Sequence, residues 1–424
     1  FRINAQPALM FARAVGITAG LCPPRPRCAQ LGQTRGLNRA CGLVGYPNVG
    51  KSSLFNAFAG SAIAAAENFP FCTIEPNVVK VGVPDARLDR LAELCSSQRV
   101  VPGQVEIRDI AGLIKGASTG AGMGNAFLSQ IRGVQVIFHV VRCFSDQKVV
   151  HVEDPVNIDP VKEYESILEE LVIADLEYAS KRLPALRKKA LTATATGTDP
   201  AKALQVYESV LKCLEDGKPA RYAIPKDEED SLSPSDEFVT QLITAKPVVV
   251  LANVAAEDAS RGNDFSARLA EHVQADAQVL GPLATRFMVI SAQLEAEVAA
   301  LDDKDFQAEY LESFGLDTAS PRALSRILAE SQSLLKLISY LTVGEQEARA
   351  WFVPRGSKAH EAAGAIHSDF TKNFEQAEIW SYEDLVKHGS KAACRKAGAA
   401  RLQGKDYKVQ DGDVIEFRIK KAKS

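Results

Sequence analysis

The run GYPNVGKSSLFNAFAG at residues 45–60 constrains the fold more than any other part of the chain. It contains Gly-x4-Gly-Lys-Ser, it follows a short apolar run, and helix-forming residues continue after it. Glycines at this spacing let backbone N–H groups turn inward around an anion at the first turn of a helix. The pattern predicts a phosphate-binding loop, whose contacts we expect from Asn48, Val49, Gly50, Lys51, Ser52 and Ser53.

Residues in and after this loop suit a triphosphate and Mg²⁺. Lys51 is expected to neutralise charge on the β- and γ-phosphates, and the Ser52 hydroxyl to ligate the ion. In NFPFCTIEPN (68–77), Thr73 can reach the same ion, although alone it would be an ordinary turn residue. In DIAG (109–112), we expect Asp109 to hold the ion's hydration shell and the Gly112 N–H to meet the γ-phosphate. Loops that order with a triphosphate and relax after its hydrolysis form a two-state switch.

Short apolar runs of the buried-strand type recur along the chain, at 41–45, 104–110, 134–141, 246–254 and 285–291. Helical patterns separate them, which predicts an α/β fold with a mostly parallel sheet flanked by helices. In such sheets the functional loops lie at the carboxyl ends of the strands. The phosphate loop, the DIAG run and the base-reading candidates all fall at such ends.

Two stretches of the chain depart from this alternation of apolar runs and helical patterns. Apolar residues at helical spacing over 164–178 and 204–214 predict a helical hairpin inserted into the sheet domain. After residue 338 the runs RAWFV, AEIWSY and DVIEFRI predict short strands of a small separate module. We therefore expect a nucleotide-binding domain in two parts (40–157 and 241–325), an inserted helical domain (158–240) and a C-terminal module (338–421).

The first 39 residues form a segment of their own. They contain six arginines and no lysine, aspartate or glutamate, which is typical of a transit peptide for a chloroplast or mitochondrion. The alternative is a disordered or mistranslated extension, with the protein in the cytoplasm. Neither interpretation bears on the fold of the remaining chain.

Composition excludes several other classes of function. The net charge of −3 offers no general basic field for nucleic acid, and no run approaches the ~18 apolar residues of a membrane-spanning helix. The eight cysteines form no C-x-x-C pair and the six histidines have no ligand spacing, so zinc is not expected. One local basic run, SKRLPALRKK at 180–189, carries five positive charges. It suits RNA phosphates and, equally, the solvated face of a helix.

The runs PNVGKSSLFNA, NFPFCTIEPN, DIAGLIKGAS and VQDGDVIEFR together resemble the Obg-like ATPase (YchF) family of P-loop proteins, from about residue 40 to the end. The resemblance implies a nucleotide domain interrupted by a helical domain and followed by a TGS module, a small β-grasp fold. It also implies ATP as ligand and a ribosome or ribosomal subunit as partner. The basic run is then the candidate for rRNA contact, with the solvated helix face as the alternative. We expect a monomer.

The loop LANVAAEDAS at residues 251–260 is where related GTPases read guanine with N-K-x-D. Here Asn253 is kept, but Val254 and Ala256 stand in the lysine and aspartate places. Guanine then loses two hydrogen bonds, whereas an asparagine amide matches the N7 acceptor and N6 donor of adenine. The family prefers ATP and has N-x-x-E, which this chain departs from by placing Glu257 one residue late.

A second base-contacting loop is expected at Ser291 and Ala292, in ISAQLEAE, although a plain serine at a strand end is the alternative. For the water that attacks the γ-phosphate, the glutamine that often follows D-x-x-G is replaced by Leu113, so slow turnover is expected.

The resemblance offers other groups to position that water. One is Asn48, through a monovalent cation such as K⁺, and another is His151, for which a surface or packing role is the alternative. A partner acting in trans is the third. His139 is expected to be a core residue. The leading hypothesis is a ribosome-associated ATPase that regulates translation or a stress response. A nucleotide-gated binding protein with incidental turnover and a GTPase are the alternatives.

Overall fold

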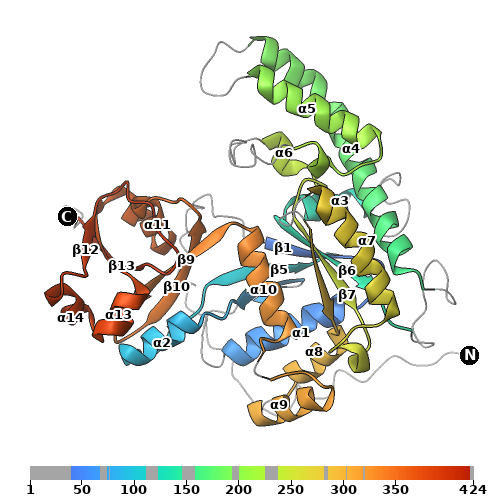
Figure 1. The fold of residues 1–424 in the computed structure, drawn as a ribbon. Helices are drawn as coiled ribbons and strands as arrows, with labels where there is room; N and C mark the ends of the chain where they lie inside the picture. The colour runs from blue at the N-terminus through green and yellow to red at the C-terminus, as the bar shows by residue number, and fades with distance from the viewer. Residues whose placement is uncertain are drawn as a thin grey trace, which may run out of the picture. The chain divides into compact units, whose positions relative to one another are not determined.

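The computed structural model describes residues 40–66, 74–75, 77–110, 123–145, 158–192, 200–224, 237–280, 285–301, 303–318 and 320–420. The strands of these parts form two sheets (Figure 1). Within the described parts, no helix combines the length and the apolar character that a bilayer crossing requires.

The larger sheet has the order β2-β3-β5-β1-β6-β7-β8. Its parallel part confirms the predicted strands, which are β1 (Ala40–Val44), β5 (Gln104–Asp109), β6 (Val136–Arg142), β7 (Val248–Asn253) and β8 (Thr285–Ile290). The short strands β2 (Ile74–Glu75) and β3 (Val78–Gly82) extend it as antiparallel neighbours of β5. Every residue of β1, β6 and β7 is buried, as expected of parallel strands that are covered on both faces.

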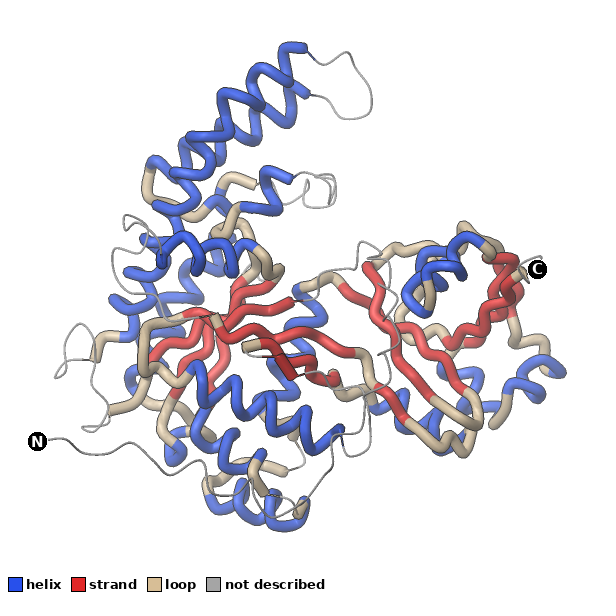
Figure 2. The backbone as a smooth tube through the Cα atoms, turned by 180° about the vertical axis from the view of Figure 1, so that it is seen from behind, coloured by secondary structure: helices blue, strands red, loops and turns tan. Residues whose placement is uncertain are grey.

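Helices lie on both faces of this sheet (Figure 2). α1 (Lys51–Ala66) packs on β1, β3 and β5 and against α8 (Ala292–Ala299). α7 (Asp264–Leu280) packs on β7 and β8, and α10 (Ala323–Leu334) contacts β5. α3 (Met123–Arg132) leads into β6, and α9 (Lys304–Ser313) follows α8. The phosphate-binding loop thus joins a fully buried strand, β1, to a helix held by the core.

The inserted helical hairpin is confirmed between β6 and β7. It consists of α4 (Pro160–Thr192) and α5 (Pro200–Glu215), which share an apolar cluster of their own. The 3-10 turn η1 (Ala220–Tyr222) and the short α6 (Glu237–Gln241) follow it before β7. Figure 1 shows the two long helices running side by side.

Asp175, a polar residue that interrupts the apolar pattern of 164–178, connects the base of this hairpin to the sheet domain. Its fully buried carboxylate accepts hydrogen bonds from Ile243 N (3.0 Å), Thr244 N (2.7 Å) and Thr244 Oγ1 (2.8 Å). Arg132, at the end of α3, pairs with the same carboxylate at 3.1 Å. Lys246 donates to three carbonyls around the end of α3, including Ile131 O at 2.7 Å. Buried polar groups are stable only when partnered in this way.

The smaller sheet has the order β12-β11-β13-β9-β10-β4, in which β4 spans Val100–Val101. Its C-terminal strands are β9 (Leu337–Val343), β10 (Ala348–Pro354), β11 (Phe374–Trp380), β12 (Arg401–Gln403) and β13 (Val414–Ile419). The accompanying helices are α11 (Ala359–Ile366), α12 (Ser368–Lys372), α13 (Tyr382–His388) and α14 (Lys391–Lys396). α11 packs on β10 and β11, and β9 pairs in parallel with β13, as in a β-grasp module.

A segment from the first part of the chain completes the core of this C-terminal module. α2 (Ala86–Leu94) places Leu88 and Leu91 in one apolar cluster with Trp380 and Leu385, and β4 (Val100–Val101) pairs in parallel with β10. Arg87 also bridges Asp85 and Asp411. Figure 1 shows α2 beside β10 and α13. The segment between β3 and β5 therefore connects two strands of the larger sheet while it packs in the core of the C-terminal module.

Leu91→Ala tests this shared core. Leu91 is fully buried, so we expect the substitution to destabilise the C-terminal module by about 2–5 kcal/mol and to expose it to limited proteolysis. Leu402→Ala is the matched control, because Leu402 is 58% exposed and its loss should change stability by less than about 0.5 kcal/mol. Equal urea-unfolding curves for both variants would show that α2 is not part of that core.

Candidate functional site

The phosphate-binding loop has the backbone that its glycines predict. Gly50 has φ +101°, and a Cβ there would lie 2.2 Å from the side-chain nitrogen of Asn253. A Cβ on Gly45 would lie 2.4 Å from the carbonyl oxygen of Val140. Asn48, which is exposed, has φ 64°, a left-handed conformation that asparagine tolerates. Larger side chains at the two glycine positions would displace neighbouring strands or the loop itself.

Lys51 begins α1 and is buried, with a side chain that turns back over the loop. Its Nζ donates a hydrogen bond of 2.7 Å to the carbonyl oxygen of Tyr46. Burial lowers the pKa of Lys51 to about 8, while the charge of Asp109 acts in the opposite direction. An arriving polyphosphate would favour the charged ammonium, so the residue is suited to the role predicted for it.

The side chains of Ser52 and Asp109 lie close enough together to bind one metal ion. β1 and β5 are neighbours in the sheet, with Leu43 opposite Asp109, and this register places the end of β5 beside the loop. The Ser52 hydroxyl donates to Asp109 Oδ2 at 3.2 Å. Asp109 Oδ1 is buried and has no hydrogen-bond partner among the described residues, and burial raises the pKa of this carboxyl. A buried oxygen awaiting a partner, beside a hydroxyl, fits a hard cation.

The donor set therefore agrees with the predicted Mg²⁺. Ser52 would ligate the ion and Asp109 would hold its hydration shell, while the ion would neutralise phosphate charge. Within the described parts, no group of three or more histidine, cysteine, aspartate or glutamate side chains forms a metal site of protein ligands alone. A site completed by phosphate and water is the usual form for Mg²⁺.

Asp109→Asn separates a metal role from a structural one. Burial disfavours the ionised carboxylate in the folded protein, so a neutral amide of the same shape should leave stability unchanged or raise it. Mg²⁺-dependent hydrolysis should fall about 10- to 100-fold. Urea unfolding and phosphate release measure the two effects, with Glu375→Gln, an exposed carboxylate on β11, as the control. Loss of both stability and activity would contradict the metal assignment.

Asn253 links the phosphate-binding loop to the loop before α8. Its Nδ2 donates to Val49 O and its Oδ1 accepts from Ala292 N, both at 2.8 Å, and the side chain is buried. A carbonyl can only accept and an amide N–H can only donate, so these two bonds determine the orientation of the side chain. One N–H and one lone pair of the amide remain for a base.

The neighbouring residues occupy different environments. Val254 is buried in the main core, and Ala256 packs in a small apolar cluster with Leu294 and Val298. Glu257 is exposed. Ser291 is buried and caps α8 by accepting a hydrogen bond from Leu294 N at 3.4 Å. An aspartate at position 256 would therefore enter an apolar cluster, so the N-K-x-D frame does not map simply onto this loop.

Several predicted site residues lie outside the described residues, namely Thr73, Gly112, Leu113 and His151. Ser53, on the first turn of α1, is exposed beside Ser52.

The prediction that His139 is a core residue is confirmed, because it is 4% exposed and its ring stacks on Tyr164 with centroids 5.1 Å apart. Burial lowers the pKa of His139 to about 3, which keeps the ring neutral.

The basic run lies on the hairpin, where part of its charge is already paired. Lys181 forms an ion pair with Glu177, and Arg187 with Glu208. Arg182 lies over the ring of Tyr178 at 5.2 Å. These contacts favour the solvated helix face, and contact with RNA remains a prediction.

Known proteins match this chain over nearly its whole described length. A family model described as "50S ribosome-binding GTPase" matches residues 40–176, and the YchF GTPase C-terminal model, described as a "Protein of unknown function (DUF933)", matches residues 337–420. Ribosome-binding ATPase YchF of Bacillus subtilis is 42% identical over 89% of this chain and 98% of its own length. Obg-like ATPase 1 of Oryza sativa subsp. japonica is 38% identical over 89% and 91%.

The chain belongs to the YchF/Obg-like ATPase family. The solved structure of the Schizosaccharomyces pombe YchF GTPase superposes with a TM-score of 0.73 at 34% identity, covering 90% of this chain and 98% of that one. The family resemblance and the α/β P-loop fold inferred from the motifs are thus confirmed. Like other YchF proteins, the chain is a P-loop nucleoside triphosphatase.

Two features of this YchF-type site were absent from the predictions. The carbonyl of Tyr46 holds Lys51, and Asn253 bridges Val49 and Ala292. Every residue has a main-chain carbonyl and every residue except proline a main-chain N–H, so no residue pattern marks the few that a site uses. The only hint was the position of Asn253 at the end of an apolar strand.

Proposed function

We propose that this protein is an ATP-hydrolysing switch that associates with ribosomes. One observation carries the nucleotide part of the proposal. Lys51, Ser52 and Asp109 lie together at the carboxyl edge of the sheet, with a hydroxyl, a carboxylate and an ammonium in reach of one bound triphosphate. The relatives named ribosome-binding ATPase support the choice of partner.

The preference for ATP rests on the base loop. Asn253 offers an oriented amide to either purine, so it does not discriminate between them. Discrimination comes from the missing carboxylate, since guanine has two donors that aspartate accepts in GTPases. Val254 and Ala256 are buried and their side chains accept no hydrogen bond, and Glu257 is exposed.

Calorimetric titration of nucleotide-free protein with ATP, GTP and their diphosphates tests the preference. We expect ATP to bind about 10- to 100-fold more tightly than GTP, because one or two unmet hydrogen bonds separate them. Glu257→Ala should leave this ratio unchanged. Tight binding of GTP that is lost in Glu257→Ala would show that Glu257 reads guanine, and would favour the GTPase alternative.

Sedimentation with purified ribosomes tests the partner and separates the second candidate function. In a switch that needs its cycle, binding depends on the nucleotide state, and a variant unable to hydrolyse ATP fails to complement loss of the protein. In a nucleotide-gated binding protein with incidental turnover, a variant that binds ATP without hydrolysing it still complements. Lys51→Ala should fail to complement in both cases, because it removes phosphate binding. Asp109→Asn, which lowers hydrolysis, should complement only in the second case.

A further inference from the structure

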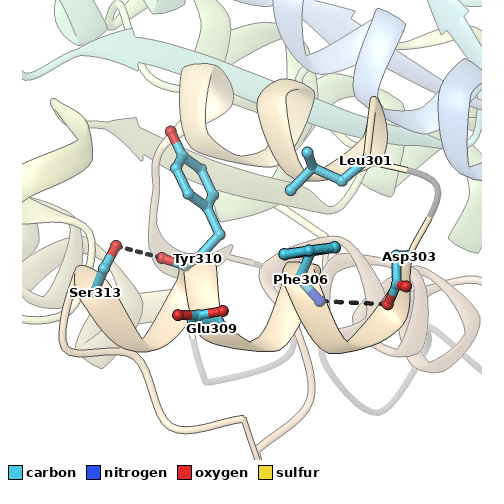
Figure 3. Close-up of a pocket in the computed structure, with 6 residues that line it drawn as sticks. All are labelled: Leu301, Asp303, Phe306, Glu309, Tyr310 and Ser313. Carbon is cyan, nitrogen blue, oxygen red and sulfur yellow. Dashed lines mark hydrogen bonds between the residues drawn. The ribbon is translucent and has the colours of Figure 1, made fainter.

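A hollow of about 530 Å³ lies beside α9, and its lining residues do not belong to the phosphate-binding loop. Figure 3 shows the side chains around it, which are Leu301, Asp303, Phe306, Glu309, Tyr310 and Ser313. In that view the rings of Phe306 and Tyr310 and the side chain of Leu301 surround the same space. The inner surface of the hollow is therefore largely apolar, with carboxylates at its edge.

The hollow is not explained by packing within the protein. α9 is held against α8 by Leu311 and its neighbours, and Tyr310 donates a hydrogen bond of 2.8 Å to Glu297. Phe306 takes no part in that cluster and is 64% exposed. Isolated exposed apolar residues are ordinary, but an exposed ring that borders an apolar hollow is a typical anchor point for a partner.

The charge around the hollow is strongly one-sided. Between residues 292 and 318 the sequence has eight carboxylates and a single lysine. Among the described residues, no ion pair compensates Asp303, Asp305, Glu309 or Glu312, and all four are exposed. Asp303 caps α9, with its carboxylate accepting from Asp305 N at 2.7 Å. The face therefore combines an apolar hollow with an excess of carboxylates among its described side chains.

We propose that this face, Leu301 together with α9, binds a segment of a partner protein that carries lysine or arginine around one bulky apolar side chain. The apolar side chain would fill the hollow and the cations would meet the carboxylates. Nucleic acid and anionic lipid are repelled by the same charge. A second copy of this chain would bring two acidic faces together, so charge complementarity favours a basic partner over self-association.

A fluorescein-labelled helical peptide, with leucine on one face and lysine and arginine on the other, is the probe. Its anisotropy is titrated with the full-length protein at low and moderate salt. Two control peptides replace every lysine and arginine by glutamate, or every leucine by alanine. The basic amphipathic peptide should bind, both controls should bind at least about tenfold more weakly, and binding should weaken as salt rises.

Variants locate the binding to this face. Phe306→Ala should weaken binding at least about tenfold and Glu309→Lys about three- to tenfold, whereas ATP hydrolysis stays unchanged. The controls are Leu402→Ala, which truncates another exposed large apolar side chain, and Glu375→Lys, which makes the same charge change. Both lie in the C-terminal module and should have no effect. Equal binding by all four variants would overturn the proposal. A dimer seen by sedimentation, and lost in Phe306→Ala, would overturn it in favour of a second copy.

Discussion

Lys51→Ala should abolish triphosphate binding and lower ATP turnover by about 10²–10³-fold or more, the scale seen when one preorganised charge-stabilising donor is removed. The ammonium is buried at the start of α1, and it is the cation that the described site directs over the loop, through its bond to Tyr46 O. Without it, the backbone N–H groups of the loop face the phosphates with less positive charge. Steady-state phosphate release and calorimetry measure the two losses.

The control for this substitution is Lys80→Ala, at an exposed lysine on β3. It removes the same charge from the same domain and should leave turnover and binding unchanged. Since burial already disfavours the Lys51 ammonium, Lys51→Ala should not unfold the protein. Normal hydrolysis by Lys51→Ala would remove the phosphate-binding loop from the mechanism.

Asn253→Ala should destabilise the nucleotide domain by about 2–6 kcal/mol, because it leaves the buried Val49 carbonyl and the Ala292 N–H without partners at about 1–3 kcal/mol each. ATP affinity should fall as well, since the amide holds the loop in its binding conformation. Urea unfolding, amide hydrogen exchange at residues 48–53 and calorimetry report these effects.

Asn253→Asp is the sharper variant at this position. A carboxylate can still accept from Ala292 N but cannot donate to Val49 O, so two acceptors would face each other in a buried site. We expect it to be at least as destabilising as Asn253→Ala. Asn56→Ala, at an exposed position on α1, is the control. If both Asn253 variants bound ATP and unfolded like the control, the bridge would have no role in the site.

The nucleotide site was predictable because its chemistry depends on residue types at fixed spacing. The P-loop pattern, the DIAG run and the apolar strands located Lys51, Ser52 and Asp109, and the structure brings these three together. Base recognition was less predictable. The simple replacement of lysine and aspartate at Val254 and Ala256 assumed a shared frame, but those side chains are buried in apolar clusters.

The domain order was also predictable, whereas the contacts between the domains were not. Helical spacing over 164–178 predicted the hairpin, and the β-patterned end of the chain predicted the terminal module. Nothing in the pattern of 86–101 indicated that α2 and β4 would pack on that module, because an amphipathic helix shows that it has a buried face but not what covers it. Asp175 was visible only as an interruption of a pattern.

By itself, the sequence determined the P-loop, the α/β sheet around it, the order of the domains and the family. These follow from local rules, namely the turn geometry of glycine, the period of apolar residues and motif spacing. Only the tertiary structure decided that Asn253 bridges two loops, that α2 completes the C-terminal core and that Phe306 borders an apolar hollow edged by carboxylates. Each of these depends on which distant atoms meet, and that is set by the packing of the whole chain rather than by any local pattern.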